Sequence, residues 1–518
     1  MEKMDKLFKY LNYLNPNGSF KRLGTIFDTR NNTYFYDSGT GKVFCCENNE
    51  LLILKFILNP SEKVKNKILN MSEMDINNAI DNILSLIKTE NILQMPIYSE
   101  FNLPSHSFLY NEVNNNLEHI VLELTERCNL RCKYCIYNED FSTFRDFSQK
   151  EMSWDIAKKS IDYGMECSGE NIMLGFYGGE PLLNYDLMKK CIDYAYENYG
   201  EKKNISILFT TNCTLITQPI AEYFASLKSC KIMCSIDGDE DIHDENRVFQ
   251  NNKGSFPASI KGFKYLIEQY GERAAENISI HSVLSPPYTF KKMEKIKNLF
   301  VQYEWIPKNL ELNCNYVNLS GMDQRTAKEK EENAMKVYRS LWMHERDTKK
   351  AWAMNSMCDS SDSYYARQIE KNEILKTHFR DLVDTPIQTL QLNGCCIPGQ
   401  KKLYVTTDGN FKVCEKIEDS PFIGNIHEGI DLEKIEDYYL NEYANLSLDK
   451  CNNCWAVHMC SICYANIYND EGINIEEKNV LCHGSRANAL NRLIEYYQIL
   501  EEKPEIIEEM IDGVEFDN

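Results

Sequence analysis

The chain has 518 residues, of which 43% are hydrophobic and 26% are charged. This is too long for one hydrophobic core, so roughly two to four domains are expected. The formal net charge of −21, with no long basic run, excludes nucleic acid as an expected partner. The longest apolar run, Leu51 to Leu58, is too short to span a bilayer, and the first residues lack the apolar core of a secretory signal. We therefore expect a cytoplasmic protein with no membrane partner.

The 20 cysteines form two groups and a scattered remainder. In a reducing cytoplasm, this number indicates metal or cluster ligation rather than a disulfide framework. The scattered cysteines are expected mostly as small buried hydrophobic side chains. The first group is Cys128, Cys132 and Cys135, and the second is Cys395, Cys396, Cys414, Cys451, Cys454, Cys460, Cys463 and Cys482.

Residues 1–105 are expected to form the first unit. Two strand-like segments flank Ser38-Gly-Thr-Gly41 and predict a hairpin with a glycine turn. Apolar residues at helical spacing follow from about Asp75. Strands followed by two or three helices predict a small winged-helix-like module, and Pro96 and Pro104 mark the linker after it.

Residues 118–320 alternate between strand-like and helix-like segments. Helical segments are expected near 150–166, 186–198, 217–227, 256–270 and 291–303. The alternation predicts an α/β fold whose parallel sheet is open or curled into a partial barrel. The strand-like runs are His119–Leu124, Ile172–Tyr177, Ile205–Thr211, Ile232–Ile236, Ile278–Leu284 and Leu310–Val317.

Three further regions complete the chain. Residues 321–394 are rich in charge and are expected to form a bridge, with a helix over Thr326–Lys350. Residues 395–485 form the cysteine-rich segment. Residues 486–518 are expected to hold a helix, Ala487–Leu500, and a solvated acidic tail.

The first cysteine group has the spacing C-x3-C-x2-C and directly follows the first strand. Three thiolates on one loop can hold three corners of a cubic iron–sulfur cluster and leave the fourth iron open to a small molecule. The alternative is a zinc site or a set of buried cysteines. The lack of an obvious fourth ligand argues against structural zinc, whose sites are normally closed.

Further motifs lie at the ends of the later strands. The second strand ends in Gly178-Gly-Glu-Pro181, the third in Thr210-Thr-Asn212 and the fourth in Ser235-Ile-Asp-Gly238. Ligands of parallel sheets bind at the carboxyl ends of the strands, so these motifs are expected on one face with the cysteine loop. Asp237, His243 and Asp244 can equally cap or hydrogen-bond a loop, and we do not count them as catalytic.

In this combination the chain resembles the radical S-adenosylmethionine (SAM) enzymes of the branch that carries a SPASM domain. The resemblance covers roughly residues 118–320 and 395–482, and it implies a partial (β/α)6 barrel that binds SAM at a [4Fe–4S] cluster on Cys128, Cys132 and Cys135. It places Tyr134 near the adenine, and Glu180 near the amino group of the cofactor. The family commonly has Gly where this chain has Cys213. The cofactor-binding residues implied are Tyr134, Gly178, Gly179, Glu180, Asn212, Ser235 and Arg247.

The same resemblance implies two auxiliary [4Fe–4S] clusters in the cysteine-rich segment. One would take Cys451, Cys454, Cys460 and Cys482. The other would take Cys396, Cys414 and Cys463, with Cys395 or a distant cysteine as its fourth ligand. Neighbouring side chains in an extended segment point to opposite faces, so Cys395 and Cys396 need not serve one cluster. A pair of zinc knuckles is the alternative.

The N-terminal unit resembles, more weakly, a winged-helix module that binds a leader peptide as an added strand; the alternative is a scaffold domain. The whole resembles thioether-forming maturases of the sactipeptide and ranthipeptide type. This implies a cysteine-containing precursor peptide with a leader as substrate, and an electron donor such as flavodoxin or ferredoxin. Glu415 is a candidate for the base that deprotonates the substrate thiol. Alternatives are an anaerobic sulfatase-maturating enzyme that forms formylglycine and a non-catalytic metal-binding interaction protein.

Overall fold

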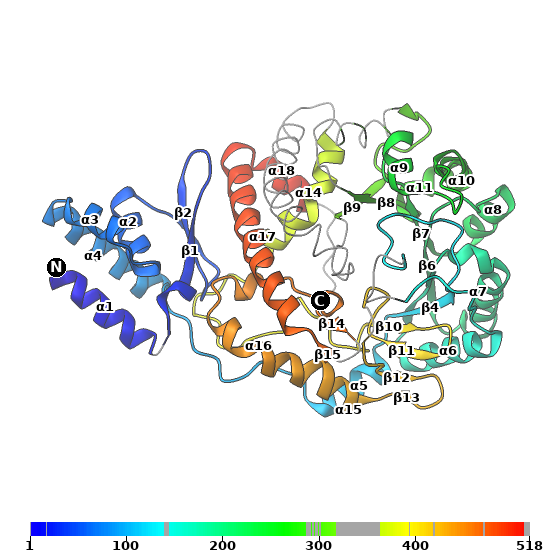
Figure 1. Ribbon diagram of the computed structural model, residues 1–518, viewed down its shortest axis with the longest axis horizontal. Helices are drawn as coiled ribbons and strands as arrows, with labels where there is room; N and C mark the ends of the chain where they lie inside the picture. Colours follow the sequence, from blue (N-terminus) through cyan, green and yellow to red (C-terminus); the bar gives the residue numbers. More distant parts are fainter. Residues whose placement is uncertain are drawn as a thin grey trace.

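The computed structural model describes most of the chain (Figure 1). The helix expected over Thr326–Lys350 lies outside the described residues, as does most of the one expected at 291–303. The described residues are 2–16, 18–138, 145–285, 302–316, 363–392, 394–417, 420–469 and 472–511, with Lys292, Lys295 and Leu299.

The N-terminal unit contains a three-stranded antiparallel sheet. Helices precede this sheet in the sequence, and further helices follow it. The predicted hairpin is confirmed, because β2 pairs with β3 on either side of the glycine turn. The order β1-β2-β3 leaves β3 at one edge. The helix α1 and the strand β1 were not expected from the sequence. The elements are α1 (Glu2–Leu14), η1 (Phe20–Leu23), β1 (Gly24–Asp28), β2 (Thr33–Asp37), β3 (Val43–Cys45), α2 (Asn48–Leu58), α3 (Glu62–Leu69) and α4 (Glu73–Glu90).

The predicted alternation of strands and helices is confirmed in the middle of the chain. All six strands are present, and consecutive strands pair in parallel. The strands are β4 (His119–Thr125), β5 (Asn171–Gly178), β6 (Asn204–Thr211), β7 (Cys230–Ser235), β8 (Ile278–Leu284) and β9 (Glu311–Tyr316). The helices are α5 (His106–Asn115), α6 (Trp154–Cys167), η2 (Pro181–Asn184), α7 (Tyr185–Tyr199), α8 (Gln218–Ser226), α9 (Glu240–Asn246), α10 (Phe256–Tyr270), η3 (Gly271–Arg273) and α11 (Ala274–Asn277).

The sheet does not end at β4, because the cysteine-rich segment extends it. Strand β10 pairs in parallel with β4, and three short antiparallel strands follow. The result is a mixed ten-stranded sheet in the order β13-β12-β11-β10-β4-β5-β6-β7-β8-β9. The cysteine-rich segment and the parallel core therefore share one sheet.

The elements after β9 complete the fold. Helix α17 runs without a break across the boundary expected between residues 485 and 486. The described elements are α14 (Ser363–His378), β10 (Lys402–Val405), β11 (Asn410–Lys412), β12 (Gly424–Asn425), β13 (Gly429–Ile430), α15 (Leu432–Lys434), the π-helix η4 (Ile435–Asn441), α16 (Glu442–Asn452), η5 (Val457–Met459), η6 (Tyr464–Asn466), β14 (Tyr468–Asn469), β15 (Gly472–Ile473), α17 (Ile475–Glu502) and α18 (Glu505–Ile511).

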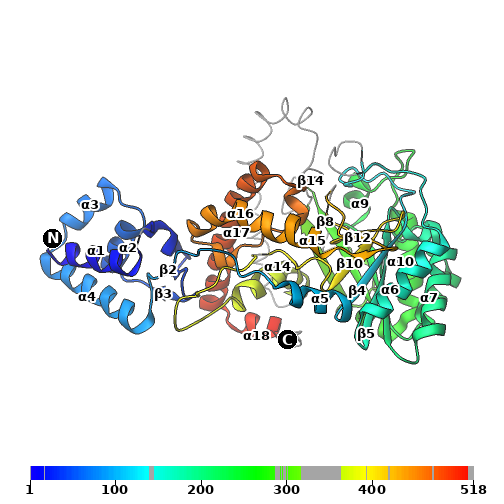
Figure 2. The ribbon, with the colours of Figure 1, turned by 90° about the horizontal axis from the view of Figure 1, so that it is seen from below.

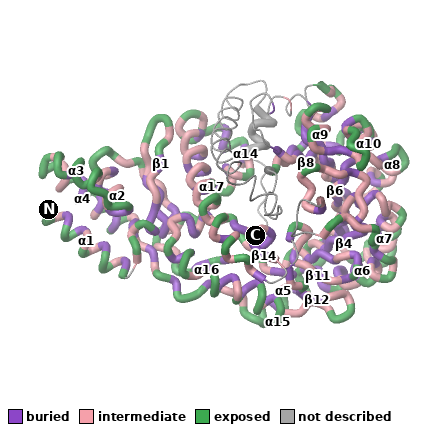
Figure 3. Tube along the Cα trace, in the orientation of Figure 1, coloured by how far each residue is buried: buried purple, intermediate pink, exposed green. Residues whose placement is uncertain are grey.

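The two faces of the parallel strands are covered by different parts of the chain. Helices α6, α7, α8 and α10 lie on the outer side, and the cysteine-rich segment lies on the other (Figures 1 and 2). Strand β4 is buried along nearly its whole length, as expected for a parallel strand covered on both faces (Figure 3). Of the described scattered cysteines, Cys167, Cys191, Cys213, Cys230 and Cys234 are buried, as expected.

The N-terminal unit packs against helix α17 (Figure 1). The rings of Phe27 and Tyr34 lie 5.7 and 5.0 Å from that of Tyr497, centroid to centroid. Ser38 also donates a 2.6 Å hydrogen bond to the carbonyl of Trp455, next to Cys454. None of the helices in the described ranges combines the length and the hydropathy that crossing a membrane requires.

Candidate active site

The first cysteine loop begins directly after β4 and is held by backbone hydrogen bonds from two sides. The amides of Gly179 and Glu180 donate to the carbonyls of Thr125 and Arg127, each at 2.9 Å. On the other side, the amide of Arg131 donates to the carbonyl of Val248 at 2.7 Å. The loop is thus fixed between the end of β5 and the segment after α9, as the motif positions predict.

The two glycines of the Gly-Gly-Glu motif are required by this loop. Gly178 has a φ of +135°, and a Cβ there would lie 2.1 Å from the carbonyl oxygen of Thr125. A Cβ on Gly179 would lie 2.1 Å from the carbonyl oxygen of Arg127. We expected these glycines to let a ligand approach; in the structure they let the backbone of the cysteine loop approach.

The three thiols fit a cluster by their chemistry. Burial raises the pKa of Cys128 and raises that of Cys132 to about 12, while the guanidinium of Arg247 opposes the rise at Cys132. The sulfur of Cys128 already accepts a hydrogen bond from the amide of Leu130 at 3.4 Å, a contact that favours a thiolate. Within the described ranges, no three His, Cys, Asp or Glu side chains are arranged around a single metal ion. Thiolates of a cubane bind separate irons, so they are spread more widely than the ligands of one ion.

Glu180 is a buried carboxylate that joins the ends of β5 and β6. One of its oxygens accepts from the hydroxyl of Thr211 at 2.8 Å, and the other accepts from the amide of Asn212 at 2.8 Å. Burial raises the pKa of Glu180 to about 7, although these hydrogen bonds oppose the rise. The carboxylate is therefore positioned, and it keeps acceptor capacity for one more donor, such as an ammonium group.

Asn212 and Cys213 form the turn after β6. The side-chain amide of Asn212 donates to the side-chain oxygen of Asn129, next to Cys128, at 2.9 Å, so the turn contacts the cysteine loop. Cys213 adopts a φ of +64°, in the left-handed region that explains the glycine common in the family at this position. Its side chain is fully buried. Cys213 in place of the family's glycine therefore fills core space, while the turn keeps its left-handed conformation.

Tyr134, Asp237 and Arg247 form one buried network beside the cysteine loop. The hydroxyl of Tyr134 donates to Asp237, and the guanidinium Nε of Arg247 lies 3.1 Å from the other oxygen of that carboxylate. The same guanidinium lies 5.4 Å from the centre of the Tyr134 ring. Ser235 ends β7 and is buried opposite His281.

His243 and Asp244 have structural roles, which is the alternative the sequence left open. His243 is fully buried and contacts the hydroxyl of Ser255 at 3.0 Å. Asp244 accepts from the amide of Phe256, at the start of α10, at 2.8 Å.

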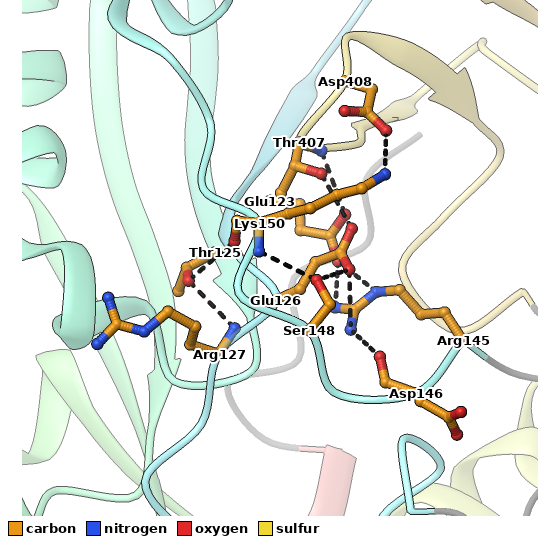
Figure 4. Close-up of polar contacts among 10 residues, drawn as sticks. All are labelled: Glu123, Thr125, Glu126, Arg127, Arg145, Asp146, Ser148, Lys150, Thr407 and Asp408. Carbon is orange, nitrogen blue, oxygen red and sulfur yellow. Dashed lines mark hydrogen bonds and ion pairs between the residues drawn. The ribbon is translucent and has the colours of Figure 1, made fainter.

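A buried ion network next to the cysteine loop was not expected (Figure 4). Glu123 of β4 accepts from Arg145 at 3.1 Å and from the amide of Thr407 at 3.3 Å. Glu126 accepts from Ser148 at 2.7 Å and from the hydroxyl of Thr407 at 3.0 Å. In the sequence, this network could have been suspected from Glu123, a lone carboxylate between the apolar residues of β4.

This network borders a cavity of about 160 Å³ between the cysteine loop and the cysteine-rich segment. Tyr137, two residues after Cys135, lines one side, with the guanidinium of Arg145 4.0 Å from the centre of its ring. Tyr404 of β10 and Glu415 line the other side. The cavity therefore lies where the carboxyl end of β4 faces the cysteine-rich segment.

Four predicted ligands of one auxiliary cluster line a single cavity of about 280 Å³: Cys451, Cys454, Cys460 and Cys482. Two donors approach their sulfurs. The hydroxyl of Ser485 lies 3.5 Å from the sulfur of Cys460, and the guanidinium of Arg486 opposes the rise that burial causes in the pKa of Cys454. Thiols gathered around one cavity with donors nearby fit a thiolate-bound group.

The remaining cysteines gather around Cys463. Its sulfur interacts electrostatically with Cys395, Cys396 and Cys414, and burial raises the pKa of each of these three thiols. Cys396 and Cys414 share Lys402 as a neighbour, whereas the thiol of Cys395 contacts the carbonyl of Ile462 at 3.4 Å.

Glu415 is held by an ion pair. Its carboxylate lies 2.6 Å from the ammonium of Lys402. Although burial favours the neutral form, Lys402 holds the pKa of Glu415 below its usual value. A carboxylate with a lowered pKa is a weak base, so the geometry does not favour Glu415 as the group that deprotonates a thiol.

Comparisons with known proteins agree with this geometry. Residues 122–300 match the model of the radical SAM superfamily. This match identifies residues 122–300 as a radical SAM domain. A domain of this kind implies a [4Fe–4S] cluster and SAM, for which the three thiols after β4 are the fitting donors.

Curated relatives match only part of the chain. An uncharacterized protein of Methanocaldococcus jannaschii is 38% identical over 156 residues, which are 30% of this chain and 50% of that protein. A serine-type anaerobic sulfatase-maturating enzyme of Bacteroides thetaiotaomicron is 30% identical over 145 residues, which are 28% of this chain and 34% of that enzyme. The chain thus spans half or less of the length of these relatives.

Among solved structures, native anSMEcpe with bound AdoMet has a similar fold. Its TM-score is 0.52 at 17% sequence identity, and the alignment covers 76% of this chain and 99% of that one. Native anSMEcpe has also been solved with AdoMet and the peptide Cp18Cys, with a TM-score of 0.50 at 16% identity over 76% of this chain and 99% of that one. At this identity the likeness concerns the fold.

Proposed function

We propose that the protein is a peptide maturase that joins a cysteine sulfur to a carbon of a ribosomally made precursor peptide. The observation that carries this proposal is one chain with a radical SAM site, a cysteine-rich segment on the same sheet and a separate N-terminal module. Cys128, Cys132 and Cys135 would hold a [4Fe–4S] cluster, whose chemistry would be to supply one electron to SAM, so that a carbon–sulfur bond breaks and methionine and a 5′-deoxyadenosyl radical are released. That radical would take one hydrogen atom from the peptide.

The residues around the loop would bind SAM. Glu180 would accept from its amino group, since its carboxylate is buried and fixed by Thr211 and Asn212. Arg247 would contribute positive charge near the carboxylate of SAM, and the ring of Tyr134 would lie near the adenine. The hydrogen bond from Tyr134 to Asp237 and the ion pair of Arg247 would hold both side chains in place.

Thioether formation removes one hydrogen atom, one proton and one electron from the peptide. We propose that auxiliary clusters in the cysteine-rich segment take the electron. The cavity with Cys451, Cys454, Cys460 and Cys482 supports one cluster, and the group around Cys463 supports the other. The zinc alternative predicts bound zinc and no labile sulfide in purified protein.

We propose that the N-terminal module binds the leader of the precursor. Within the described residues, β3 pairs only with β2, so its outer edge can accept an added strand. The opposite side of the small sheet, at β1, faces α17. A scaffold role for the module predicts no affinity for the leader.

A second candidate is the formation of formylglycine, because curated relatives include a serine-type and a cysteine-type anaerobic sulfatase-maturating enzyme. One experiment separates the two. Anaerobically reconstituted enzyme is incubated with SAM, dithionite and a cysteine-containing precursor encoded next to it, and the product is analysed by mass spectrometry. A thioether keeps the sulfur and loses two hydrogens, whereas formylglycine formation from cysteine loses the sulfur. Absence of SAM cleavage in wild-type protein would refute both.

A further inference from the structure

The first cysteine loop is positively charged, although the chain as a whole is strongly acidic. The chain has 78 Asp and Glu against 57 Lys and Arg. In contrast, Arg127, Arg131 and Lys133 alternate with the cysteines over seven residues of the loop. Such a local reversal of sign favours an acidic partner over nonspecific contacts.

Two of these side chains, Arg131 and Lys133, form no ion pair with a carboxylate in the part of the chain that the structure describes. One guanidinium nitrogen of Arg131 donates to the carbonyls of Cys128 and Leu130, at 2.8 and 2.7 Å, and the group lies 4.2 Å from the centre of the Phe147 ring. The exposed Lys133 donates to the backbone carbonyl of Glu245 at 2.6 Å. Arg127 differs, because it pairs with Glu151 at 2.5 Å.

A cavity of about 210 Å³ lies next to two of these charges, Arg127 and Arg131, and reaches Cys128. Its lining includes Arg127, Cys128, Arg131 and Gln250. It shares no lining residue with the cavity between Glu123 and Tyr404, which faces the cysteine-rich segment. Two separate cavities therefore border the loop. The one lined by Arg127 and Arg131 contains Cys128, a predicted ligand of the first cluster.

We propose that this basic face of the loop, formed by Arg127, Arg131 and Lys133, is the docking surface for a small acidic one-electron carrier protein. The inference rests on the proposed radical chemistry at this site. The reduced carrier would donate one electron through the Cys128 side and would leave oxidised by one electron, while the cluster would be reduced by one. Opposite charges would increase the rate of encounter and align the carrier over the cavity.

The test compares two sources of electrons. Reconstituted wild-type protein, Lys133→Glu and Lys228→Glu are mixed anaerobically with a recombinant acidic flavodoxin in its hydroquinone form, and cluster reduction is followed by stopped-flow absorbance. Lys228 is an exposed residue between α8 and β7, before the amino end of a strand, so its variant is a control with the same charge change. The same three proteins are then reduced with dithionite, a small reductant that needs no protein docking.

Lys133→Glu should slow reduction by flavodoxin about three- to tenfold at low ionic strength, and salt should shrink the difference from wild type. Lys133→Arg should restore the rate, and Lys228→Glu should match wild type. All variants should be reduced normally by dithionite. Equal flavodoxin rates for wild type and Lys133→Glu, with normal dithionite reduction, would overturn the docking surface alone. Failure of dithionite to reduce wild-type protein would instead overturn the proposed function.

Discussion

At the scale of single residues, the parallel strands gather polar side chains from separate motifs, because their carboxyl ends meet at one edge of the sheet. Glu180, Asn212 and Asp237 all lie at that edge, in hydrogen-bonding contact with the cysteine loop or its neighbours. The partners of Glu123 were not predictable. They lie 22 and 284 residues away in the chain, at Arg145 and Thr407, where no periodicity connects them.

Glu180 should make the stability of the metal-free protein depend on pH. Burial raises its pKa from an ordinary 4.5 to about 7, so the folded state binds the proton more tightly than the unfolded state. Its contribution to stability is therefore fullest below pH 4.5 and is lost as the pH rises through about 7. The loss is at most about 3 kcal/mol.

Urea denaturation of the metal-free protein at pH 5 and pH 8 measures this effect. The gap in unfolding free energy between wild type and Glu180→Gln should change in favour of the variant at the higher pH. The exposed Glu201→Gln serves as the control and should follow wild type at both values. A gap that is the same at both pH values would contradict the raised pKa.

Asp237 should be costly to remove, because it neutralises a buried cation. Asp237→Ala leaves Arg247 without its ion partner and Tyr134 without its acceptor. Breaking such a pair from one side costs roughly 3–5 kcal/mol. Thermal or chemical unfolding should show this loss, and adding Arg247→Met should recover part of it. Additive effects of the two substitutions would argue against the pairing.

At the scale of elements, the six core strands were predictable to within one or two residues, because apolar residues run or alternate through each strand and polar segments bound it. Strands β10 to β13 were not predicted from the sequence. Strand β10 has four residues, and β12 and β13 have two each, which is too short for a period to emerge. The pairing of β10 with β4, and of β11, β12 and β13 beyond it, depends on tertiary contacts that no local pattern reports.

Gly179→Ala tests how the strand end of β5 holds the cysteine loop. The new Cβ would meet the backbone carbonyl of Arg127 at 2.1 Å, so the loop must move. Reconstituted variant should lose about four irons, one cluster's content, while far-ultraviolet circular dichroism stays close to wild type. Gly169→Ala is the matched control, since its Cβ would meet nothing within 4 Å. Full iron content in Gly179→Ala would show that the loop tolerates the displacement.

At the scale of the whole molecule, the position of the N-terminal module could not be predicted from the sequence. Its separate helices and strands were visible as patterns, but its docking depends on aromatic side chains far apart in the chain. Tyr34 and Tyr36 contact Tyr497 and Trp455, respectively. Because Trp455 follows Cys454 and α17 carries Cys482, the module packs against the same segments that line the four-cysteine cavity.

One carboxylate at the end of α17 gathers much of the polar contact at this junction. Glu501 accepts hydrogen bonds from Thr29, Asn32 and Tyr34 at 2.9, 2.8 and 2.7 Å, and from Asn31 at 3.2 Å. Although partial burial opposes it, these donors hold the pKa of Glu501 below its usual value. Because the pKa of Glu501 is lowered in the folded protein, its ionised carboxylate stabilises docking of the module at pH values above the ordinary Glu pKa of 4.5. This stabilisation is lost as the pH falls below that value.

Glu501→Ala should therefore loosen the module and expose the linker around Pro96 and Pro104. Limited proteolysis at pH 7 should cut this linker several-fold faster in the variant than in wild type, because four donors lose their acceptor. Lowering the pH toward 4 should speed cleavage of wild type more than of the variant, measured with a protease active across that range. Glu505→Ala, an exposed change in α18, is the control and should cleave like wild type. Equal cleavage of Glu501→Ala and wild type at pH 7 would show that the aromatic contacts alone hold the module in place.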